Sequence, residues 1–393
     1  ISLSNLTDER MRMAKSGDWW VDNQQRALSN NSVCYTERPD MGIFMKEWLS
    51  LYESKSGERG IFNRASAQVK AAANGRRDGN IDFGTNPCCE IILRPYQFCN
   101  LSEVICRADD TIETLKNKIK LATMLGTFQS TLTDFGYLRK RWKDTTEEER
   151  LLGVSLTGIM DCPAVYDASP EALQQLRDVA VKTNKKMAEK LGINQSTAVT
   201  CVKPSGTVSQ LVNAASGIHA RHNPHYVRTV RGDNKDPLTM FLKDKGIPSE
   251  PDFTAPDNVT VFSFPMKSPE GAICRYDMSA LAQLELWLKI ADNYCEHKPS
   301  VTISVKENEW LEVGAWCWEH FDSLSGISFL PFSDHSYKQA PYQDIDKEAF
   351  KELTEKMPPA IDWYELQDYE KEDTTTGSQE LACAGGVCEI VDI

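Results

Sequence analysis

Three side chains that could act together on one small substrate lie within a short segment of the sequence. Asn86, Cys88 and Glu90 occupy every second position of Asn-Pro-Cys-Cys-Glu, so an amide, a thiol and a carboxylate alternate with other residues. Residues two apart project to the same side of an extended chain, and an extended loop would therefore turn all three toward one site. The alternative is a simple turn that happens to contain them, because Asn-Pro commonly opens turns.

Further thiols extend this chemistry. Cys99 follows in Phe-Cys-Asn-Leu-Ser, and Cys383 and Cys388 lie near the end of the chain with four residues between them. A dithiol on a mobile end could enter a cleft and exchange a disulfide with thiols there, and the alternative is a disordered end with two idle thiols. The cysteines lack the paired two-residue spacing of zinc knuckles, so we expect no metal site. Together these thiols favour a reaction that uses a cysteine and consumes two thiol electrons in each turnover.

A third segment has the composition of a phosphate-binding turn. A predicted strand at 199–202 leads into Lys-Pro-Ser-Gly-Thr-Val-Ser, which spans 203–209 and begins a predicted helix. Backbone N–H groups and hydroxyls in such a turn can hold a phosphate, although a Ser or Thr helix cap without a ligand has the same sequence pattern. The Gly-Lys-Ser/Thr order of a Walker loop is absent. The candidate phosphate-binding residues are Ser205, Gly206, Thr207 and Ser209.

The segment that follows, 216–231, is rich in basic side chains. It contains three histidines and three arginines. The histidines could be metal ligands, but the nearby arginines would repel a cation. We therefore expect a solvated or anion-facing loop.

Alternating helices and strands must position these residues. Apolar residues at spacings of three and four predict helices over 119–137, 163–192 and 344–356, the second ending in Leu-Gly. Short β-branched or aromatic runs predict buried strands at 32–36, 60–63, 199–202, 259–263, 300–305 and 326–330. The alternation indicates an α/β fold with a parallel sheet covered by helices.

Composition restricts the class of protein. The 393 residues are 41% hydrophobic and 26% charged, which suits a large core and excludes disorder as the main state. A net charge of −13 argues against a surface built to hold nucleic acid or anionic lipid. The sequence has neither a membrane-spanning apolar run nor a signal peptide pattern, so a cytoplasmic protein is expected. Because the chain opens with Ile1 in what reads as a loop, we expect a fragment that lacks its N-terminal part.

Taken in this order, the motifs resemble those of a known family. Asn-Pro-Cys-x-Glu, Cys-Asn-Leu-Ser, Lys-Pro-Ser-Gly-Thr-x-Ser and the terminal Cys-x-x-x-x-Cys are similar to segments of the catalytic chain of ribonucleotide reductases, as are 56–63 and 149–158. The resemblance spans nearly the whole chain, and the combination is specific although each motif alone is not. It is strongest to the class II, adenosylcobalamin-dependent ribonucleoside-triphosphate reductases found in bacteria and their phages.

The resemblance implies a role for each residue of the first segment. Cys88 would carry the thiyl radical that removes the 3′-hydrogen of a ribonucleotide, Glu90 would accept the 3′-hydroxyl proton, and Asn86 would orient the sugar hydroxyls. Cys99 would be one of two thiols that reduce the substrate as the 2′-hydroxyl leaves as water. Its partner in the family lies far upstream, in a part that we expect to be missing, and Cys34 does not match that position.

The same resemblance implies the ligands and partners of an oxidoreductase that makes 2′-deoxyribonucleotides for DNA replication. The four candidate phosphate-binding residues would hold the ribonucleotide substrate. Cys383 and Cys388 would reduce the disulfide formed in the reaction and be recharged by thioredoxin or a similar dithiol. Effector nucleotides are allowed as further ligands, and neither a membrane nor a nucleic acid is implied. Cys89 departs from the family pattern, and on an extended loop its side chain would point away from that of Cys88.

The source of the radical separates the alternatives. In class I enzymes two adjacent tyrosines on a late barrel strand relay the radical from a second subunit, and the similar stretch here, 326–332, has no tyrosine pair. This favours directly bound adenosylcobalamin. The alternatives are a class I ribonucleoside-diphosphate reductase large subunit with a separate radical-generating subunit, and a non-catalytic nucleotide-binding remnant.

The resemblance also implies an architecture. It is a ten-stranded α/β barrel of two parallel half-sheets set antiparallel, with the Cys88 loop at the centre, where the radical is shielded from water. We expect the chain to keep that loop and the second half-barrel. The predicted domains are a catalytic barrel at 1–370, without its N-terminal part, and a flexible redox tail at 371–393.

Overall fold

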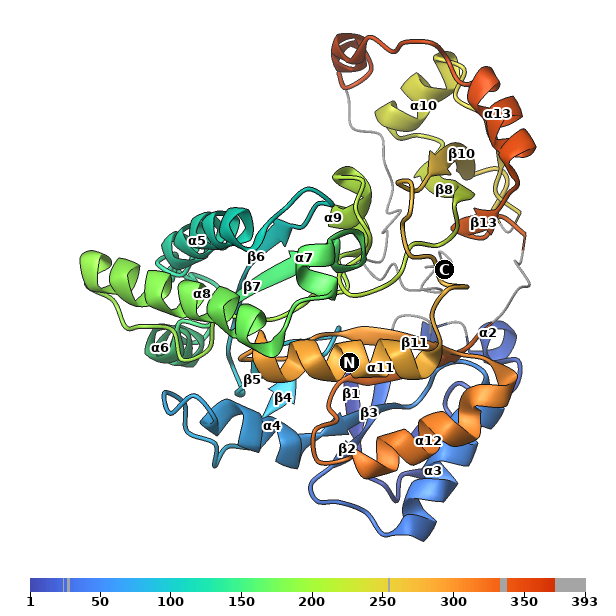
Figure 1. The fold of residues 1–393 in the computed structure, drawn as a ribbon. Helices are drawn as coiled ribbons and strands as arrows, with labels where there is room; N and C mark the ends of the chain where they lie inside the picture. The colour runs from blue at the N-terminus through green and yellow to red at the C-terminus, as the bar shows by residue number, and fades with distance from the viewer. Residues whose placement is uncertain (24, 27–28, 254, 333–337, 372–393) are drawn as a thin grey trace. The chain divides into compact units, whose positions relative to one another are not determined.

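The structure is a computed structural model that describes residues 1–23, 25–26, 29–253, 255–332 and 338–371. These residues form two compact units, both drawn in Figure 1. The first comprises Ile1–Ala220 and Met278–Phe332, and the second comprises Arg221–Asp277 and the described residues after position 337. The predicted catalytic domain at 1–370 thus contains both units.

The predicted redox tail at 371–393 lies outside the described residues except for its first position. Cys383 and Cys388 are among the residues that are not described. Their roles stay predictions.

A five-stranded sheet forms the core of the first unit. Its order is β1 (Ser2–Ser4), β2 (Asn31–Tyr35), β3 (Gly60–Asn63), β12 (Ile327–Pro331) and β11 (Val301–Val305). The first three strands are parallel, β11 and β12 are parallel, and the two groups meet antiparallel where Ile327 pairs with Ile61. All four residues of β3 are buried, as expected for a strand in the middle of a covered sheet. The strands predicted at 32–36, 60–63, 300–305 and 326–330 are confirmed to within one residue.

A second group of parallel strands continues this pairing. β6 (Asn100–Ile105) and β7 (Leu152–Thr157) are parallel, and β7 is buried along its whole length. Isolated parallel bridges join Val154 to Thr200 and Val202 to Pro299, just before β11. The strand predicted at 199–202 is therefore present as a bridging segment. β6 and β7 were not predicted, and Figure 1 shows them beside helices α5 (Ile112–Gln129) and α8 (Pro170–Leu191), which pack on each other.

The helix boundaries follow from how their terminal backbone groups are satisfied. The Ser169 hydroxyl accepts from the Ala172 N–H at the start of α8, and Gly192 ends it with a φ of +66°. The helix predicted at 163–192 is thus confirmed, although a break separates α7 (Pro163–Tyr166) from α8. α5 begins and ends earlier than the 119–137 prediction, because Thr111 and Thr114 form a capping box at its start.

A short hairpin carries the Asn-Pro-Cys-Cys-Glu segment. Its strands are β4 (Gly84–Thr85) and β5 (Ile92–Leu93), which pair antiparallel. Two-residue strands cannot hold a hairpin by themselves, so its position depends on contacts with the rest of the unit.

The second unit contains a four-stranded antiparallel sheet. Its order is β13 (Tyr342–Asp344), β8 (His225–Asp233), β10 (Val259–Lys267) and β9 (Ser249–Pro251). The expectation of a loop throughout 216–231 is wrong, because the nine residues from His225 to Asp233 form a strand that pairs with β10. Tyr226, Val227 and Thr229 are buried in this strand, although its basic residues suggested a solvated segment. The strand predicted at 259–263 is confirmed, but it belongs to this antiparallel sheet. The helix predicted at 344–356 is confirmed as α13 (Lys347–Lys356).

The remaining helical elements complete the described chain. They are α1 (Glu9–Arg12), α2 (Trp19–Asp22), α3 (Met41–Ser54), α4 (Arg64–Ala72), α6 (Lys140–Glu149), η2 (Ile159–Asp161), α9 (Gly206–Leu211), α10 (Pro237–Asp244), α11 (Ala280–Asn293), η3 (Glu307–Glu309), α12 (Trp310–Glu319) and η4 (Trp363–Asp368). Among the described helices, none combines the length and the apolar character needed to cross a bilayer.

The predicted α/β fold is confirmed, but a closed barrel is not seen. Among the described residues the strands form four separate sheets. Within the five-stranded sheet, two parallel groups do meet antiparallel, which agrees with the expected relation between half-sheets.

Candidate active site

The hairpin loop is a tight turn. The Cys89 N–H donates to the Asn86 carbonyl oxygen at 3.0 Å, and Cys89 has a left-handed φ of +64°. The Asn86 side-chain oxygen accepts from the Ile91 N–H at 3.0 Å. The expectation of an extended loop is therefore wrong, because Pro87 has a restricted φ and the Asn86 amide closes the loop on itself. The alternative of an Asn-Pro turn is correct, and it still carries the thiol and the carboxylate.

The two adjacent thiols have different surroundings. Cys88 is partly exposed and Cys89 is buried. The Cys89 sulfur lies 3.9 Å from the Pro87 carbonyl oxygen, and an added Cβ on Gly326 would stand 2.6 Å from the Cys89 Cβ. Burial raises the pKa of the Cys89 thiol to about 11, against the opposing charge of Lys298. Cys89 therefore packs inward as a neutral thiol.

Glu90 is fully buried and has one oxygen without a partner. Its Oε1 lies 2.9 Å from the Lys203 Nζ, and its Oε2 has no hydrogen-bond partner among the described residues. Burial acts to lower the pKa of Lys203, but the Glu90 charge and hydrogen bond outweigh it and the pKa is raised. Cys88 acts on Lys203 in the same direction, which places this thiol within electrostatic range of the ion pair.

Cys99 lies at the edge of the same group of residues. It precedes β6 and packs against a buried cluster that includes Ile91 and Cys201. Burial raises the pKa of the Cys99 thiol strongly, and Glu90 adds to the shift while Arg77 opposes it. Cys99 is thus within electrostatic range of Glu90, and Cys88 is within electrostatic range of the lysine that binds Glu90.

Cys34 lies elsewhere. It is in β2, opposite Phe62, and packs on a different core cluster that includes Phe83 and Ile92. The expectation that Cys34 is not the partner of Cys99 stays a prediction.

The candidate phosphate loop is partly committed to bonds within the protein. Ser205 has a left-handed φ of +53°, and its hydroxyl donates to the Glu103 carboxylate. Ser209 is fully buried, and its hydroxyl lies 2.7 Å from that of Ser216. Thr207 is exposed and Gly206 is partly exposed. Two of the four predicted residues therefore face outward, and two have hydroxyls engaged inside the loop.

Glu103 is a site residue that sequence reasoning missed. It lies on β6, and its Oε1 also accepts from the Ser155 hydroxyl at 3.4 Å. Burial raises the pKa of the Glu103 carboxyl, while the Ser205 hydrogen bond and the Lys203 charge oppose the shift. The only sequence signal was an acidic residue in an otherwise apolar run after Cys-Asn-Leu-Ser.

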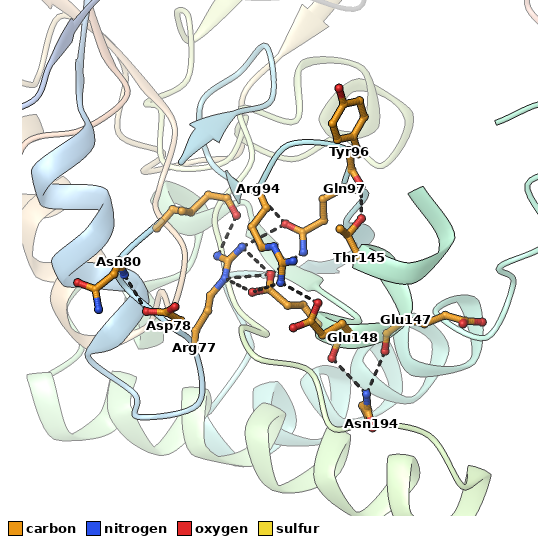
Figure 2. A network of polar contacts seen from close by, with 12 residues as sticks. Arg77, Asp78, Asn80, Arg94, Tyr96, Gln97, Thr145, Glu147, Glu148 and Asn194 are labelled. Carbon is orange, nitrogen blue, oxygen red and sulfur yellow. Dashed lines mark hydrogen bonds and ion pairs between the residues drawn. The ribbon is translucent and has the colours of Figure 1, made fainter. Parts of the chain in front are cut away.

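A buried polar network holds the chain between the hairpin and Cys99. Arg77 pairs with Glu149 at 2.8 Å and donates to the Ile92 carbonyl oxygen at 2.9 Å. Gln97 accepts from the Arg94 N–H at 2.9 Å and from Arg77 at 3.2 Å, and it donates to Glu149. Burial lowers the pKa of Arg77, and Glu149 partly offsets the shift. Figure 2 shows Arg77, Arg94 and Gln97 gathered at this point.

Two neighbouring residues hold the hairpin from its other side. His297 Nδ1 accepts from the Ile92 N–H at 3.3 Å, so its Nε2 carries the proton donated to the Leu152 carbonyl oxygen at 3.1 Å. Burial, with Arg77 next in importance, lowers the pKa of His297 well below its usual value. The Lys298 N–H donates to the Glu90 carbonyl oxygen at 3.0 Å, and burial lowers the pKa of its amine to about 7. No sequence motif pointed to this pair.

Comparisons with known proteins agree with this picture. No family model matches the sequence. The chain is 26% identical over 408 residues to the adenosylcobalamin-dependent ribonucleoside-triphosphate reductase of Lactobacillus delbrueckii subsp. bulgaricus, covering 93% of this chain and 53% of that protein. It is 28% identical over 317 residues to the enzyme of the same name from Euglena gracilis, covering 77% of this chain and 42% of that protein. The chain spans about half the length of the curated relatives it matches.

A solved structure gives the class of fold. A B12-dependent, class II ribonucleotide reductase superposes with a TM-score of 0.73 at 22% identity, covering 95% of this chain and 55% of that chain. The described chain therefore has the fold of part of that class II ribonucleotide reductase. In sequence, this chain is similar over most of its length to proteins named adenosylcobalamin-dependent ribonucleoside-triphosphate reductase.

Replacing Arg77 by Met should destabilise the protein by about 3 kcal/mol, because it removes the buried guanidinium that contacts Glu149 at 2.8 Å and leaves this buried carboxylate with Arg94, at 3.5 Å, as its remaining cation. The free energy of unfolding in urea measures this loss. The control is Lys140→Ala, which removes an exposed ion pair with Asp144 at 3.4 Å and should change stability by less than about 0.5 kcal/mol. Equal effects of the two substitutions would contradict the role given to the buried pair.

Replacing Gly326 by Ala should lower the free energy of unfolding by about 2–4 kcal/mol. Residue 326 has a left-handed φ of +70°, and the added Cβ would overlap Cys89. Gly192→Ala is the matched control, since it has a φ of +66° but nothing within 4 Å of the added Cβ. It should cost only about 1–2 kcal/mol. Thermal and urea unfolding of both variants isolate the contact with the hairpin, and a control as costly as Gly326→Ala would refute it.

Proposed function

We propose that this chain is the catalytic part of an adenosylcobalamin-dependent ribonucleoside-triphosphate reductase, an enzyme that reduces ribonucleotides to 2′-deoxyribonucleotides by thiyl-radical chemistry. The observation that carries the proposal is the Glu90 carboxylate. It is fully buried, has one oxygen bound by Lys203 and the other without a partner, and shares its surroundings with Cys88 and Cys99. A buried oxygen without a partner suits a general base that meets a substrate hydroxyl.

The proposed roles follow the geometry of the hairpin. As a thiyl radical, Cys88 removes the 3′-hydrogen, so that an S–H bond forms as the C–H bond breaks. Glu90 Oε2 takes the proton of the 3′-hydroxyl. The Asn86 oxygen is engaged by Ile91 N–H, so we assign its NH2 group to the sugar hydroxyls.

The reduction needs two electrons, which we assign to thiols. The 2′-hydroxyl leaves as water with a proton from a thiol, and Cys99 with a second thiol supplies two electrons and becomes a disulfide. Cys88 then returns a hydrogen atom to C3′ and is again a thiyl radical. Cys383 and Cys388 reduce the disulfide by exchange, and thioredoxin or a similar dithiol recharges them.

The substrate phosphates are assigned to the loop at 205–209. Gly206 and Thr207 support this assignment best, because they are accessible. The hydroxyls of Ser205 and Ser209 bond to Glu103 and Ser216, so these two residues would act mainly through their backbone.

Adenosylcobalamin, when bound, would generate the radical on Cys88. The fit rests on the partial exposure of Cys88 and the exposure of Pro87 beside it, which leave the loop tip accessible to a bound group. Position 326, at the start of β12, touches Cys89, and β12 itself, Ile327–Pro331, contains no tyrosine that could relay a radical. We assign no residue of this chain to the cofactor.

The same proposal extends to the barrel architecture, the domains, the effector ligands and the cellular location of the protein. In a longer protein the sheets described above would close into the ten-stranded barrel, as the catalytic domain at 1–370 followed by the redox tail at 371–393. Effector nucleotides would be additional ligands. We place the protein in the cytoplasm, where its thiols would stay reduced.

The test is reduction of a ribonucleoside triphosphate with adenosylcobalamin and either dithiothreitol or thioredoxin, measured as deoxynucleotide formed. Cys88→Ala should lower the rate more than about a thousandfold with either reductant. Cys383→Ser should lose activity only with thioredoxin, because dithiothreitol reduces the active-site disulfide directly.

Cys317→Ala is a matched control that removes a buried thiol of α12, and it should retain activity with both reductants. Activity that adenosylcobalamin does not stimulate would favour the class I alternative. Nucleotide binding without consumption of thiols would favour the non-catalytic alternative.

A further inference from the structure

The lysine that opens the candidate phosphate loop points toward the carboxylate of the hairpin. Lys203 Nζ donates to Glu90 Oε1 at 2.9 Å, and the Glu90 side chain has no exposed surface. A lysine beside a phosphate loop is ordinarily read as a phosphate ligand. Here its charge neutralises a buried side chain of a different element.

The backbone of Lys203 is fixed from two directions. Its N–H donates to the Ser155 hydroxyl of β7 at 2.9 Å. On the other side Gly217 packs so closely that an added Cβ would stand 2.2 Å from the Lys203 carbonyl oxygen. The backbone that carries the Lys203 side chain is therefore held in place. A residue that orients another side chain needs such support.

The charges around Lys203 explain why Glu90 needs it. Glu90 and Glu103 are both within electrostatic range of Lys203, and the Glu90 charge raises the pKa of the Glu103 carboxyl while Lys203 opposes the shift. Cys88 and Cys201 are also within electrostatic range of this lysine and act to raise its pKa. Of the described charged groups in this set, Lys203 is the cation that directly contacts Glu90. Without it a buried carboxylate beside a second carboxylate would favour its protonated form.

We propose that Lys203 is a positioning residue for Glu90: it binds Oε1 and keeps the carboxylate ionised, so that Oε2 alone is presented to the substrate hydroxyl. The inference rests on the proposed function and adds a residue to it. In the proton transfer, the substrate O–H bond breaks and a bond to Oε2 forms, while Lys203 keeps its own proton throughout. The phosphate loop thus supplies the counterion of the base.

The experiment compares Lys203→Met, Lys203→Arg and the control Lys118→Met in the ribonucleotide reduction assay. Lys118 lies on α5 and pairs with Asp110 at 2.6 Å. Its substitution therefore also removes one lysine–carboxylate pair, but one that does not include Glu90. Lys203→Met should lower kcat about 100-fold or more with KM changed only a few-fold. Lys203→Arg should recover most of kcat, and Lys118→Met should match the unsubstituted protein.

The pH profile separates an orienting role from a structural one. In Lys203→Met the pH below which activity is lost should move upward by about one unit or more, because the buried carboxylate ionises less readily without its cation. In a Glu90→Gln background, Lys203→Met should add little further loss. An unshifted profile, or a loss carried by KM with kcat unchanged, would overturn the proposal and return Lys203 to phosphate binding.

A readout without turnover keeps this test separate from that of the proposed function. At a pH between the acid limits of the two activity profiles, infrared difference spectra between Lys203→Met and Lys203→Met/Glu90→Gln should contain a protonated carboxyl band that the corresponding spectra with Lys203 intact lack. Absence of the band in a folded variant, verified by thermal unfolding, would refute the role of Lys203. Its presence in a protein that reduces no ribonucleotide would uphold the pairing and refute only the proposed reaction.

Discussion

The buried ion pair between Arg77 and Glu149 is the interaction on which the site geometry depends. Moving two charges out of water costs several kcal/mol each, and the cost is offset only where the geometry is good and the remaining donors and acceptors are satisfied. Here the guanidinium also bonds the Ile92 carbonyl and Gln97, and Gln97 in turn holds the Arg94 N–H. The ion pair therefore fixes the segment that connects the base-bearing hairpin to Cys99.

The opposite side of the hairpin is held by neutral groups. A protonated His297 could not accept from the Ile92 N–H, so the same burial that disfavours its charge preserves the hydrogen bond. The Lys298 backbone adds a bond to Glu90, and the Val202 N–H bonds to the Lys298 carbonyl oxygen at 3.1 Å. Through these contacts the parallel strands carry the precision that a hairpin of two-residue strands lacks.

Sequence patterns predicted the elements whose signals are local. The apolar run of β3 and the Ser169 and Gly192 ends of α8 are determined by side chains next to them. β6 was not predicted because most of its residues are only partly buried. β8 was not predicted because its arginines indicated a solvent-exposed segment. Periodicity reports burial of side chains, and it is weak where strands carry polar groups for a site.

The same distinction holds for the candidate site. Residue types and spacing predicted Asn86, Cys88, Glu90 and Cys99 as site residues, and in the structure the two thiols are within electrostatic range of Glu90 or of the lysine that binds it. The conformation of the loop could not be predicted from the sequence, because Asn-Pro is compatible with both a turn and an extended segment. The contacts of Lys203, Glu103 and His297 were not predicted from the sequence. Each of these residues bonds to a residue far away in the sequence, and no local pattern encodes such a contact.

The packing of position 326 against position 89 links two sites that are distant in the chain. The backbone at 89 has the left-handed conformation that glycine adopts at least cost, yet a cysteine occupies it, and position 326 has no side chain. A Cβ added at 326 would stand 2.6 Å from the Cys89 Cβ and 2.7 Å from the Cys89 carbonyl oxygen. The backbone of the hairpin by itself therefore demands glycine at 326, and in related chains that share this turn position 326 should stay glycine whatever side chain position 89 carries.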